Sequence, residues 1–210
     1  MLRNKILILI PATIIVCLIS CASPDNDPLP IYGIAEITDN GDTLNYKIPD
    51  FNLINQDSLR IRNEDLDNYI YIADFFFMSC PSICPKVKKQ MLRLYDRFES
   101  ENQIKLVSHT IDPKRDTPER LKQFASNLEV STEKWIFLTG TKDSMMDMAH
   151  AYMVSAMEDP EAPGGFDHSG KILLVDKNRH IRAFADGTEP EEVDKFMVKI
   201  DKLLKEYAAE

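Results

Sequence analysis

The chain has 210 residues and a mass of 24.1 kDa, and 44% of its residues are hydrophobic while 28% are charged. This length and composition fit one globular domain with a short surplus, and they exclude a collagen-like, a wholly disordered or a multi-span membrane protein. The net charge of −9 predicts an acidic surface that repels phosphate backbones, so nucleic acid is not expected as a partner.

The first twenty residues have the pattern of an export signal. Arg3 and Lys5 form a basic start, and the apolar run that follows, residues 6–19, is shorter than the roughly 20 residues that a membrane-spanning helix needs. The run ends Leu-Ile-Ser-Cys, which resembles the lipobox of bacterial lipoproteins and implies that Cys21 carries lipid. We predict a signal peptide over residues 1–20 and a lipid-anchored protein of the bacterial cell envelope, with its domain outside the cytoplasm. An uncleaved short anchor is the alternative.

Residues 21–45 are predicted to be the lipidated cysteine and a tether, because the stretch ASPDNDPLP contains three prolines, two aspartates and little apolar content. The remaining residues, 46–210, form one predicted domain. Once the signal is removed and the anchor is lipidated, only Cys80 and Cys84 remain as thiols. They would lie in an exported compartment, where free thiols tend to be oxidised or bound to metal.

Strands and helices are predicted to alternate along the domain. The apolar and β-branched segments predict strands at 48–53, 69–78, 104–111, 135–138, 171–175 and 181–184, and helical periodicity predicts helices at 87–98, 118–128, 142–152 and 190–207. A loop rich in proline and glycine is expected over 159–169. This order predicts an α/β class and a thioredoxin-like fold, with a central mixed sheet flanked by helices and a terminal β-hairpin.

The sequence SCPSICP, residues 79–85, lies between a predicted buried strand and a helix. Two cysteines four residues apart at a helix start lie on one face of the first turn, where unpaired N–H groups and the helix dipole favour thiolates. Such a pair can exchange a disulfide or chelate a soft metal such as Cu(I) or Zn(II). A buried pair of cysteines packed as small hydrophobic residues is the alternative.

A third ligand is expected from the histidines. His168 lies in a predicted loop directly before a strand, where it could face the two thiolates, and an imidazole helps a Cys-Cys-His set to accommodate Cu(II). A solvated surface histidine is the alternative. His109 is expected in the core or beside the site rather than as a ligand. His150 and His180 are expected to be structural or exposed.

Two further features lie near the predicted site. Asp112 follows the strand at 104–111 and could orient a ligand or shape the entrance, although a turn and a helix cap explain it equally well. Most methionines are expected to fill gaps in the core. Met153 and Met157, which precede the loop of His168, are the two that could reach a metal.

Four motifs together resemble the Sco/SenC family, and the likeness covers about residues 46–207. The matching segments are CPSICP at 80–85, DPKRDTP at 112–118, FLTG at 137–140 and DHS at 167–169, together with IPDF at 48–51. The resemblance implies a membrane-tethered, thioredoxin-like domain that binds copper through Cys80, Cys84 and His168, with Asp112 as a supporting residue. It also implies a role in assembling the CuA centre of cytochrome c oxidase. The family pattern does not explain His109.

Two functions follow from these features. The first is a copper-binding metallochaperone for Cu(I) or Cu(II), whose partner is the cytochrome c oxidase subunit with the CuA site or another cuproprotein. The alternative is a thiol–disulfide oxidoreductase in which Cys80 and Cys84 are the catalytic redox pair and His168 is not required. A peroxide-reducing relative is a weaker third reading. The protein is expected to contact the membrane through its lipid and to be a monomer, and whether it turns over as an enzyme stays open.

Overall fold

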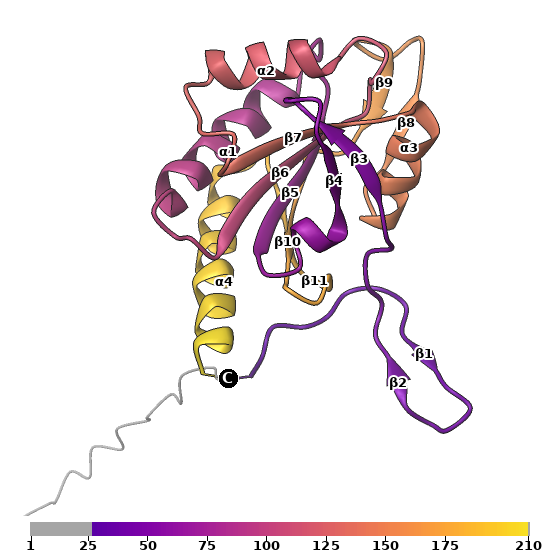
Figure 1. Cartoon of the computed structure of the whole chain (residues 1–210), viewed down its shortest axis with the longest axis vertical. Helices are drawn as coiled ribbons and strands as arrows, with labels where there is room; N and C mark the ends of the chain where they lie inside the picture. Colours follow the sequence, from indigo (N-terminus) through magenta and orange to yellow (C-terminus); the bar gives the residue numbers. More distant parts are fainter. Residues whose placement is uncertain (1–26, 210) are drawn as a thin grey trace, which may run out of the picture.

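A mixed seven-stranded sheet forms the centre of the molecule in the computed structural model, which describes residues 27–209 (Figure 1). Its strands are β3 (Asn52–Asn55), β4 (Arg60–Arg62), β5 (Ile70–Phe76), β6 (Ile104–Thr110), β7 (Trp135–Thr139), β10 (Lys171–Val175) and β11 (Ile181–Asp186). Their order is β11-β10-β5-β6-β7-β3-β4, with β5, β6 and β7 parallel and the other neighbours antiparallel. The α/β class, the mixed sheet and the terminal hairpin are therefore confirmed.

Four helices cover the two faces of this sheet. They are α1 (Cys84–Phe98), α2 (Pro118–Asn127), α3 (Lys142–Ala151) and α4 (Pro190–Ala208), and a short 3₁₀ helix spans Asn63–Asp65. One core cluster joins α1, α2 and α4 to one face of the sheet, and a second cluster joins α3 to the other (Figure 1). Within the described residues, no helix is both long enough and apolar enough to cross a membrane.

β5 is buried along its whole length, as the unbroken apolar segment predicts. Ile70 and Ile72 belong to the core cluster with α1, and Tyr71 and Ala73 belong to the cluster with α3. The loops after β5 and β6 leave the sheet at the same edge, because these strands are parallel and paired to their ends. This edge is where the cysteine segment is placed.

The prediction of a strand at 48–53 is wrong in its bounds, since β3 begins at Asn52. Pro49 has no N–H to donate to a ladder, and Ile48 and Phe51 are instead buried as irregular chain in the core. The short strand β4 beyond it was not predicted.

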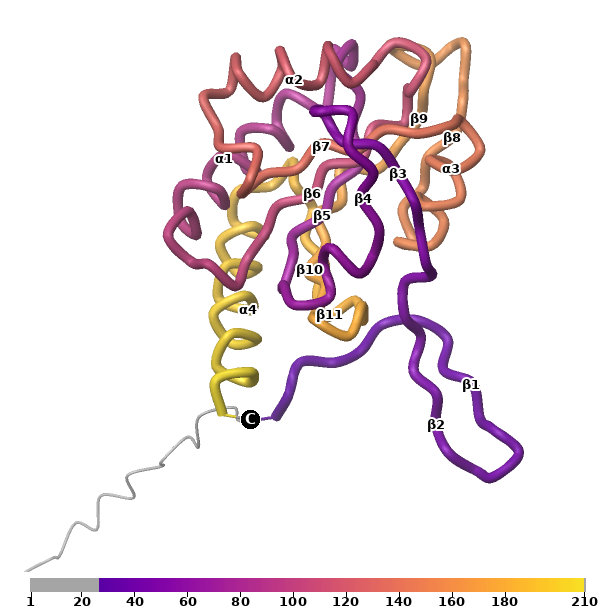
Figure 2. The backbone as a smooth tube through the Cα atoms, in the orientation of Figure 1, coloured from indigo at the N-terminus to yellow at the C-terminus, as the bar shows by residue number. Residues whose placement is uncertain are grey.

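Two short hairpins lie outside the central sheet. One, β8 (Ala156–Glu158) with β9 (Phe166–His168), occupies most of the predicted loop at 159–169. The other, β1 (Glu36–Ile37) with β2 (Thr43–Leu44), projects from the body within the predicted tether (Figure 2).

The chain also packs against the domain before this second hairpin begins. Leu29 is buried, its N–H donates to Glu206, and its carbonyl accepts a hydrogen bond from Arg182. The beginning and the end of the described chain therefore lie together at one end of the molecule. The predicted signal and the predicted lipidation site at Cys21 lie outside the described residues.

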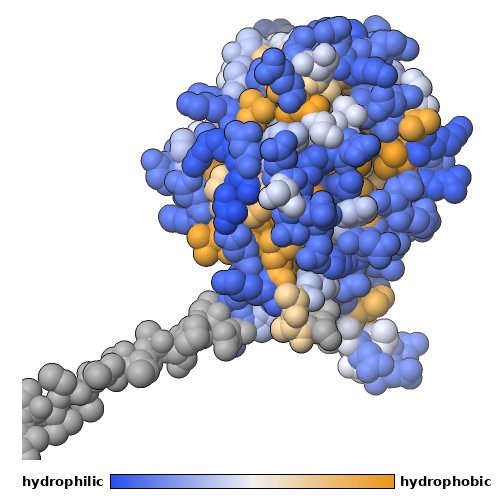
Figure 3. Space-filling view, turned by 60° about the vertical axis from the view of Figure 1, so that its left-hand side comes forward, coloured by the Kyte–Doolittle hydropathy of each residue, from blue (hydrophilic) through white to orange (hydrophobic). Residues whose placement is uncertain are grey.

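Hydrophilic residues predominate on the face shown in Figure 3, where apolar residues form small separate groups. This agrees with the composition of the chain, in which 28% of the residues are charged.

Candidate metal centre

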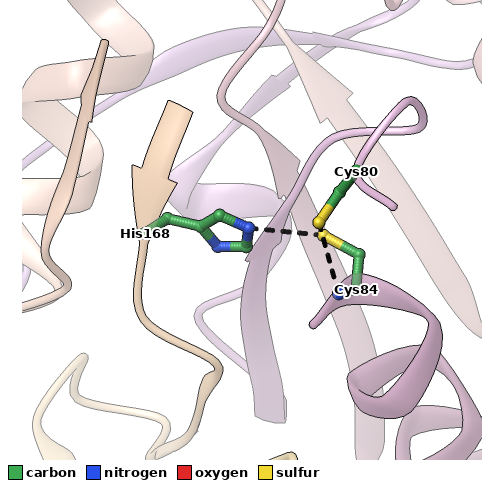
Figure 4. A group of neighbouring side chains, drawn as sticks. All are labelled: Cys80, Cys84 and His168. Carbon is green, nitrogen blue, oxygen red and sulfur yellow. Dashed lines mark hydrogen bonds between the residues drawn. The ribbon is translucent and has the colours of Figure 1, made fainter. Parts of the chain in front are cut away.

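The two cysteines lie at the junction of β5 and α1. Cys80 is in the turn after β5, where its N–H donates to the carbonyl of Phe77 at 3.2 Å, and Cys84 is the first residue of α1. The N–H of Cys84 points at the sulfur of Cys80, with N and Sγ 3.5 Å apart (Figure 4). The helix start has no acidic side chain, so the Cys80 sulfur takes the place of a capping group there. Pro85 is accommodated because the first turn needs no donor.

His168 reaches the cysteines from the other side of the sheet edge. It is the last residue of β9 and pairs with Ala156 of β8, and its Nε2 lies 3.4 Å from Sγ of Cys84 (Figure 4). Nδ1 lies 3.3 Å from the carbonyl oxygen of Ser169, a contact that orients the ring so that Nε2 faces the sulfurs, where it can donate to a thiolate or, without its proton, ligate a metal. The edge of the imidazole packs on Phe77, with ring centroids 5.3 Å apart.

The prediction that His168 lies in a loop is wrong, because the residue closes a strand and is only 8% exposed. Gly164 and Gly165 adopt positive φ angles of 86° and 92° and let the chain turn into β9. At Gly164 a Cβ would lie 2.6 Å from the ring of Phe77, so the turn can pass close to the site only with glycine there. The hairpin thus holds the imidazole in one position.

The ligand atoms of Cys80, Cys84 and His168 all lie within 4.8 Å of one another. Among residues 27–209, they form the one group of at least three histidine, cysteine or acidic side chains close enough to hold a metal ion. Both cysteines are free thiols. Two sulfurs and one imidazole nitrogen form a soft donor set, and such sets suit Cu(I) and Zn(II) better than Mg²⁺ or Ca²⁺.

The two thiols differ in acidity. Burial acts to raise the pKa of Cys80, but hydrogen bonds from His168 and from the backbone of Cys84 and Ser82 outweigh it and lower that pKa to about 6. Burial raises the pKa of Cys84 well above its usual value, and the neighbouring Cys80 raises it further. At neutral pH, Cys80 is therefore the reactive thiolate and Cys84 keeps its proton until a metal or a disulfide replaces it.

Asp112 does not belong to the ligand group. Its carboxylate forms an ion pair with Arg115, whose guanidinium also donates to the carbonyl of Gly164 at 2.7 Å. Its backbone carbonyl accepts from the N–H of Arg115 and of Asp116, which closes the turn after β6. Asp112 therefore shapes this turn and, through Arg115, contacts the segment that leads to β9.

Two buried carboxylates near the site were missed from the sequence. Asp116 is fully buried and accepts hydrogen bonds from the N–H of Met78 at 3.0 Å and from the hydroxyl of Thr110 at 2.7 Å, so it ties the cysteine segment to the end of β6. Asp74, the one acidic residue in β5, accepts from the hydroxyl of Ser108. The position of Asp74 inside an otherwise apolar strand was the sequence signal that could have identified it as a buried carboxylate.

The other histidines lie away from the ligand group. His109 is fully buried in the core, where it stacks on Phe75 with ring centroids 4.7 Å apart, and neither ring nitrogen has a hydrogen-bond partner. This confirms the core position predicted for it. His150 is exposed on α3, and His180 lies 3.4 Å from the carboxylate of Asp176.

Of the two methionines that could reach a metal, Met157 does not face the ligand group. Met157 is 55% exposed and neighbours Ala156, the residue of β8 that pairs with His168. Successive side chains of a strand point to opposite faces, so Met157 points away from the face of His168. Met153 takes a positive φ of 56° in the turn after α3.

Comparison with known proteins shows that this chain is similar in sequence to members of one family. The SCO1/SenC family model matches residues 40–205. The SCO1 protein homolog of Bacillus subtilis (strain 168) is 31% identical over 150 residues, which covers 70% of this chain and 78% of that protein. A protein of Stutzerimonas stutzeri named "Putative copper-binding protein" is 32% identical over 139 residues, which covers 64% of this chain and 67% of the relative.

Solved structures agree with this placement. A SCO1/SenC family lipoprotein from Bacillus anthracis str. Ames superposes with a TM-score of 0.69 at 25% identity, over 77% of this chain and 96% of that one. BsSco, described as a member of the Sco family of cytochrome c oxidase assembly proteins with a disulfide switch, gives a TM-score of 0.66 at 28% identity, over 80% and 97%. The thioredoxin-like fold is thereby confirmed, and the chain belongs to the SCO1/SenC family.

Proposed function

We propose that this protein is a copper-binding metallochaperone that assists assembly of the CuA centre of cytochrome c oxidase. The observation that carries the proposal is the convergence of Cys80, Cys84 and His168, whose ligand atoms lie within 4.8 Å of one another. Two thiolates suit Cu(I), and the imidazole helps the same site to accept Cu(II). The name of the Stutzerimonas stutzeri relative supports the metal, and the description of BsSco supports the class of partner.

The proposal includes the cellular setting predicted from the sequence. Residues 1–20 act as a lipoprotein signal, residues 21–45 carry the lipid on Cys21 and tether the domain, and residues 46–210 form the copper-binding domain in the cell envelope. The similar Bacillus anthracis protein is itself a lipoprotein, which supports an anchor of this kind. The partner is the oxidase subunit with the CuA site or another cuproprotein.

A competition titration with Cu(I) tests the ligand set. The reduced chain from residue 22 onward is expected to bind one Cu(I), and Cys80→Ala and Cys84→Ala are each expected to remove tight binding. His168→Ala is expected to weaken binding, and His150→Ala, which changes an exposed histidine, serves as the matched control. Parental affinity in the two cysteine variants and in His168→Ala would contradict the assignment.

A second function, thiol–disulfide reduction, is favoured by the unequal acidity of the two cysteines. The Cys80 thiolate would attack a disulfide of a partner, so that the partner's S–S bond breaks and one of its sulfurs leaves as a thiolate. Cys84 would then lose its proton and attack the sulfur of Cys80, which releases the partner's second thiolate and leaves a Cys80–Cys84 disulfide. The two electrons come from the cysteine pair, and the disulfide switch named for BsSco supports this role.

Reduction of an oxidised peptide, with and without a copper chelator, separates the two functions. Reduction that persists in His168→Ala and is unaffected by the chelator favours the oxidoreductase. Reduction by the parent protein that stops when the chelator removes copper contradicts it.

A further inference from the structure

An open cavity borders the cysteine pair on the side of α1 and α2. Its walls include the two cysteines, Cys80 and Cys84, and five aromatic residues. The aromatic residues are Phe77 and a group of four, Phe76, Phe124, Trp135 and Phe137. The cavity is small, about 50 Å³, and is partly open to solvent. The rings of the group of four contact one another at centroid distances from 5.1 to 6.1 Å, so the cavity is formed by packed side chains before any ligand arrives.

Phe77 separates the cavity from His168. It lines the cavity, and the edge of the His168 imidazole packs on its ring, with ring centroids 5.3 Å apart. His168 is not among the residues that line the cavity, whereas both cysteines are. A ligand in the cavity can therefore reach the cysteines without contacting the imidazole directly.

The polar groups that line the cavity are already paired with each other. The hydroxyl of Ser108 donates to Asp74 and accepts a hydrogen bond from the indole N–H of Trp135 at 2.8 Å. Since these groups are satisfied, the cavity favours an apolar ligand over a polar one.

Basic residues of α1 lie beside the cavity in a chain whose net charge is −9. No acidic residue occurs between Asp74 and Asp96. Lys88 lines the cavity and its Nζ lies 5.7 Å from the ring centroid of Phe124. Lys89 is exposed, lies one helical turn after the lining residue Pro85, and forms no ion pair with any residue of 27–209.

We propose that this cavity receives an apolar side chain from a partner protein, next to the partner's reactive cysteine, and that Lys88 and Lys89 of α1 pair with acidic residues of the same segment. The inference rests on the proposed function, because it names the segment that meets the cysteine pair during transfer of metal or of a disulfide. Opposite charge across such an interface speeds the encounter and selects among partners.

Three cysteine peptides activated with 5-thio-2-nitrobenzoate test the proposal on the reduced, copper-free full chain. Their sequences are Asp-Leu-Cys-Asp, Lys-Leu-Cys-Lys and Asp-Gly-Cys-Asp. The Cys80 thiolate attacks the peptide sulfur, the S–S bond to the dye breaks, and the dye leaves as a coloured thiolate while a protein–peptide disulfide forms. Reaction with Asp-Leu-Cys-Asp is expected to exceed the other two by on the order of tenfold at low salt.

Variants separate the contributions of charge and of the cavity. Lys89→Gln is expected to reduce the ratio of the acidic to the basic peptide, whereas Lys47→Gln removes the same charge next to the β1–β2 hairpin and should leave this ratio unchanged. Phe124→Ala is expected to reduce the preference for leucine over glycine and to leave the charge preference intact. Ratios between peptides cancel any general change in Cys80 reactivity.

Equal rates for the three peptides, or preferences unchanged in Lys89→Gln and Phe124→Ala, would overturn the proposal. Copper stoichiometry is measured separately on the same protein. If the protein binds no copper but keeps both peptide preferences, the metallochaperone is refuted and the role proposed for the cavity is supported. If it binds copper but shows neither preference, the metallochaperone is supported and the role of the cavity is refuted.

Discussion

His109 should make the stability of this protein depend on pH. The imidazole is fully buried between Phe75 and Tyr152, and its two nitrogens have no hydrogen-bond partner. Burial lowers the pKa of His109 from 6.5 to about 4. The unfolded chain therefore binds more protons than the folded one between these two values, so stability is fully present above pH 6.5 and is lost as the pH falls towards 4.

The size of this effect follows from the two pKa values. Between about pH 8 and about pH 5, protonation of His109 in the unfolded chain should lower the free energy of unfolding by about 2 kcal/mol. His109→Phe keeps a flat ring against Phe75 and removes the titration. The free energy of unfolding of the variant minus that of the parent should therefore be about 2 kcal/mol larger at pH 5 than at pH 8.

Urea denaturation of parent and variant at the two pH values measures this difference. Taking the difference between the two proteins removes the contributions of all other titrating groups, which include Asp74 acting in the opposite direction. A parent–variant difference that is the same at both pH values would refute the reasoning, because it would show that folding does not shift the pKa of His109.

Three further predictions concern groups around the cysteine segment. Burial raises the pKa of Asp74 to about 7, so the folded pKa exceeds the unfolded one and the parent loses stability as the pH rises from about 4 to 7. Above that range Asp74→Asn should be more stable than the parent by up to about 4 kcal/mol, as measured by denaturant titration. Alkylation of Cys80 in Cys84→Ser should reach half its maximal rate near pH 6, and a midpoint close to 9 would contradict the thiolate assigned to Cys80. Asp116→Ala leaves the N–H of Met78 and the hydroxyl of Thr110 without an acceptor. The variant should have a free energy of unfolding lower by about 2 kcal/mol and should bind copper more weakly. Parental values in both measurements would show that Asp116 does not position the cysteines.

The parts of the fold that sequence predicts well are those with a local pattern. β5 is apolar apart from Asp74, and the helices at 142–152 and 190–207 follow the spacing of their buried residues. Apolar periodicity predicts a helix from Val87, whereas α1 begins at Cys84. The prediction that both cysteines lie on the first turn of the helix is wrong for Cys80, which lies before the helix. Proline in a first turn hides the true start from a pattern of buried residues.

The parts that sequence predicts poorly depend on contacts between distant segments. His168 is predicted as a third ligand from its place before a strand and from the family resemblance, but β9 is not predicted, since its three residues follow a stretch rich in proline and glycine. Its pairing with β8 is a property of the folded chain alone. Similarly, nothing local shows that Asp116 reaches back to Met78, or that the paired side chains of Asp74 and Ser108 lie beside the cysteines.

Absorption spectroscopy during a Cu(II) titration of the reduced chain from residue 22 onward tests the three-ligand site most directly. The parent is expected to bind one equivalent and to develop an intense thiolate-to-copper band, which should be absent in Cys80→Ala and weakened in His168→Ala. If the parent bound neither Cu(II) nor Cu(I) in stoichiometric amount, the metallochaperone would be refuted, and the cysteine pair would be left as a redox device.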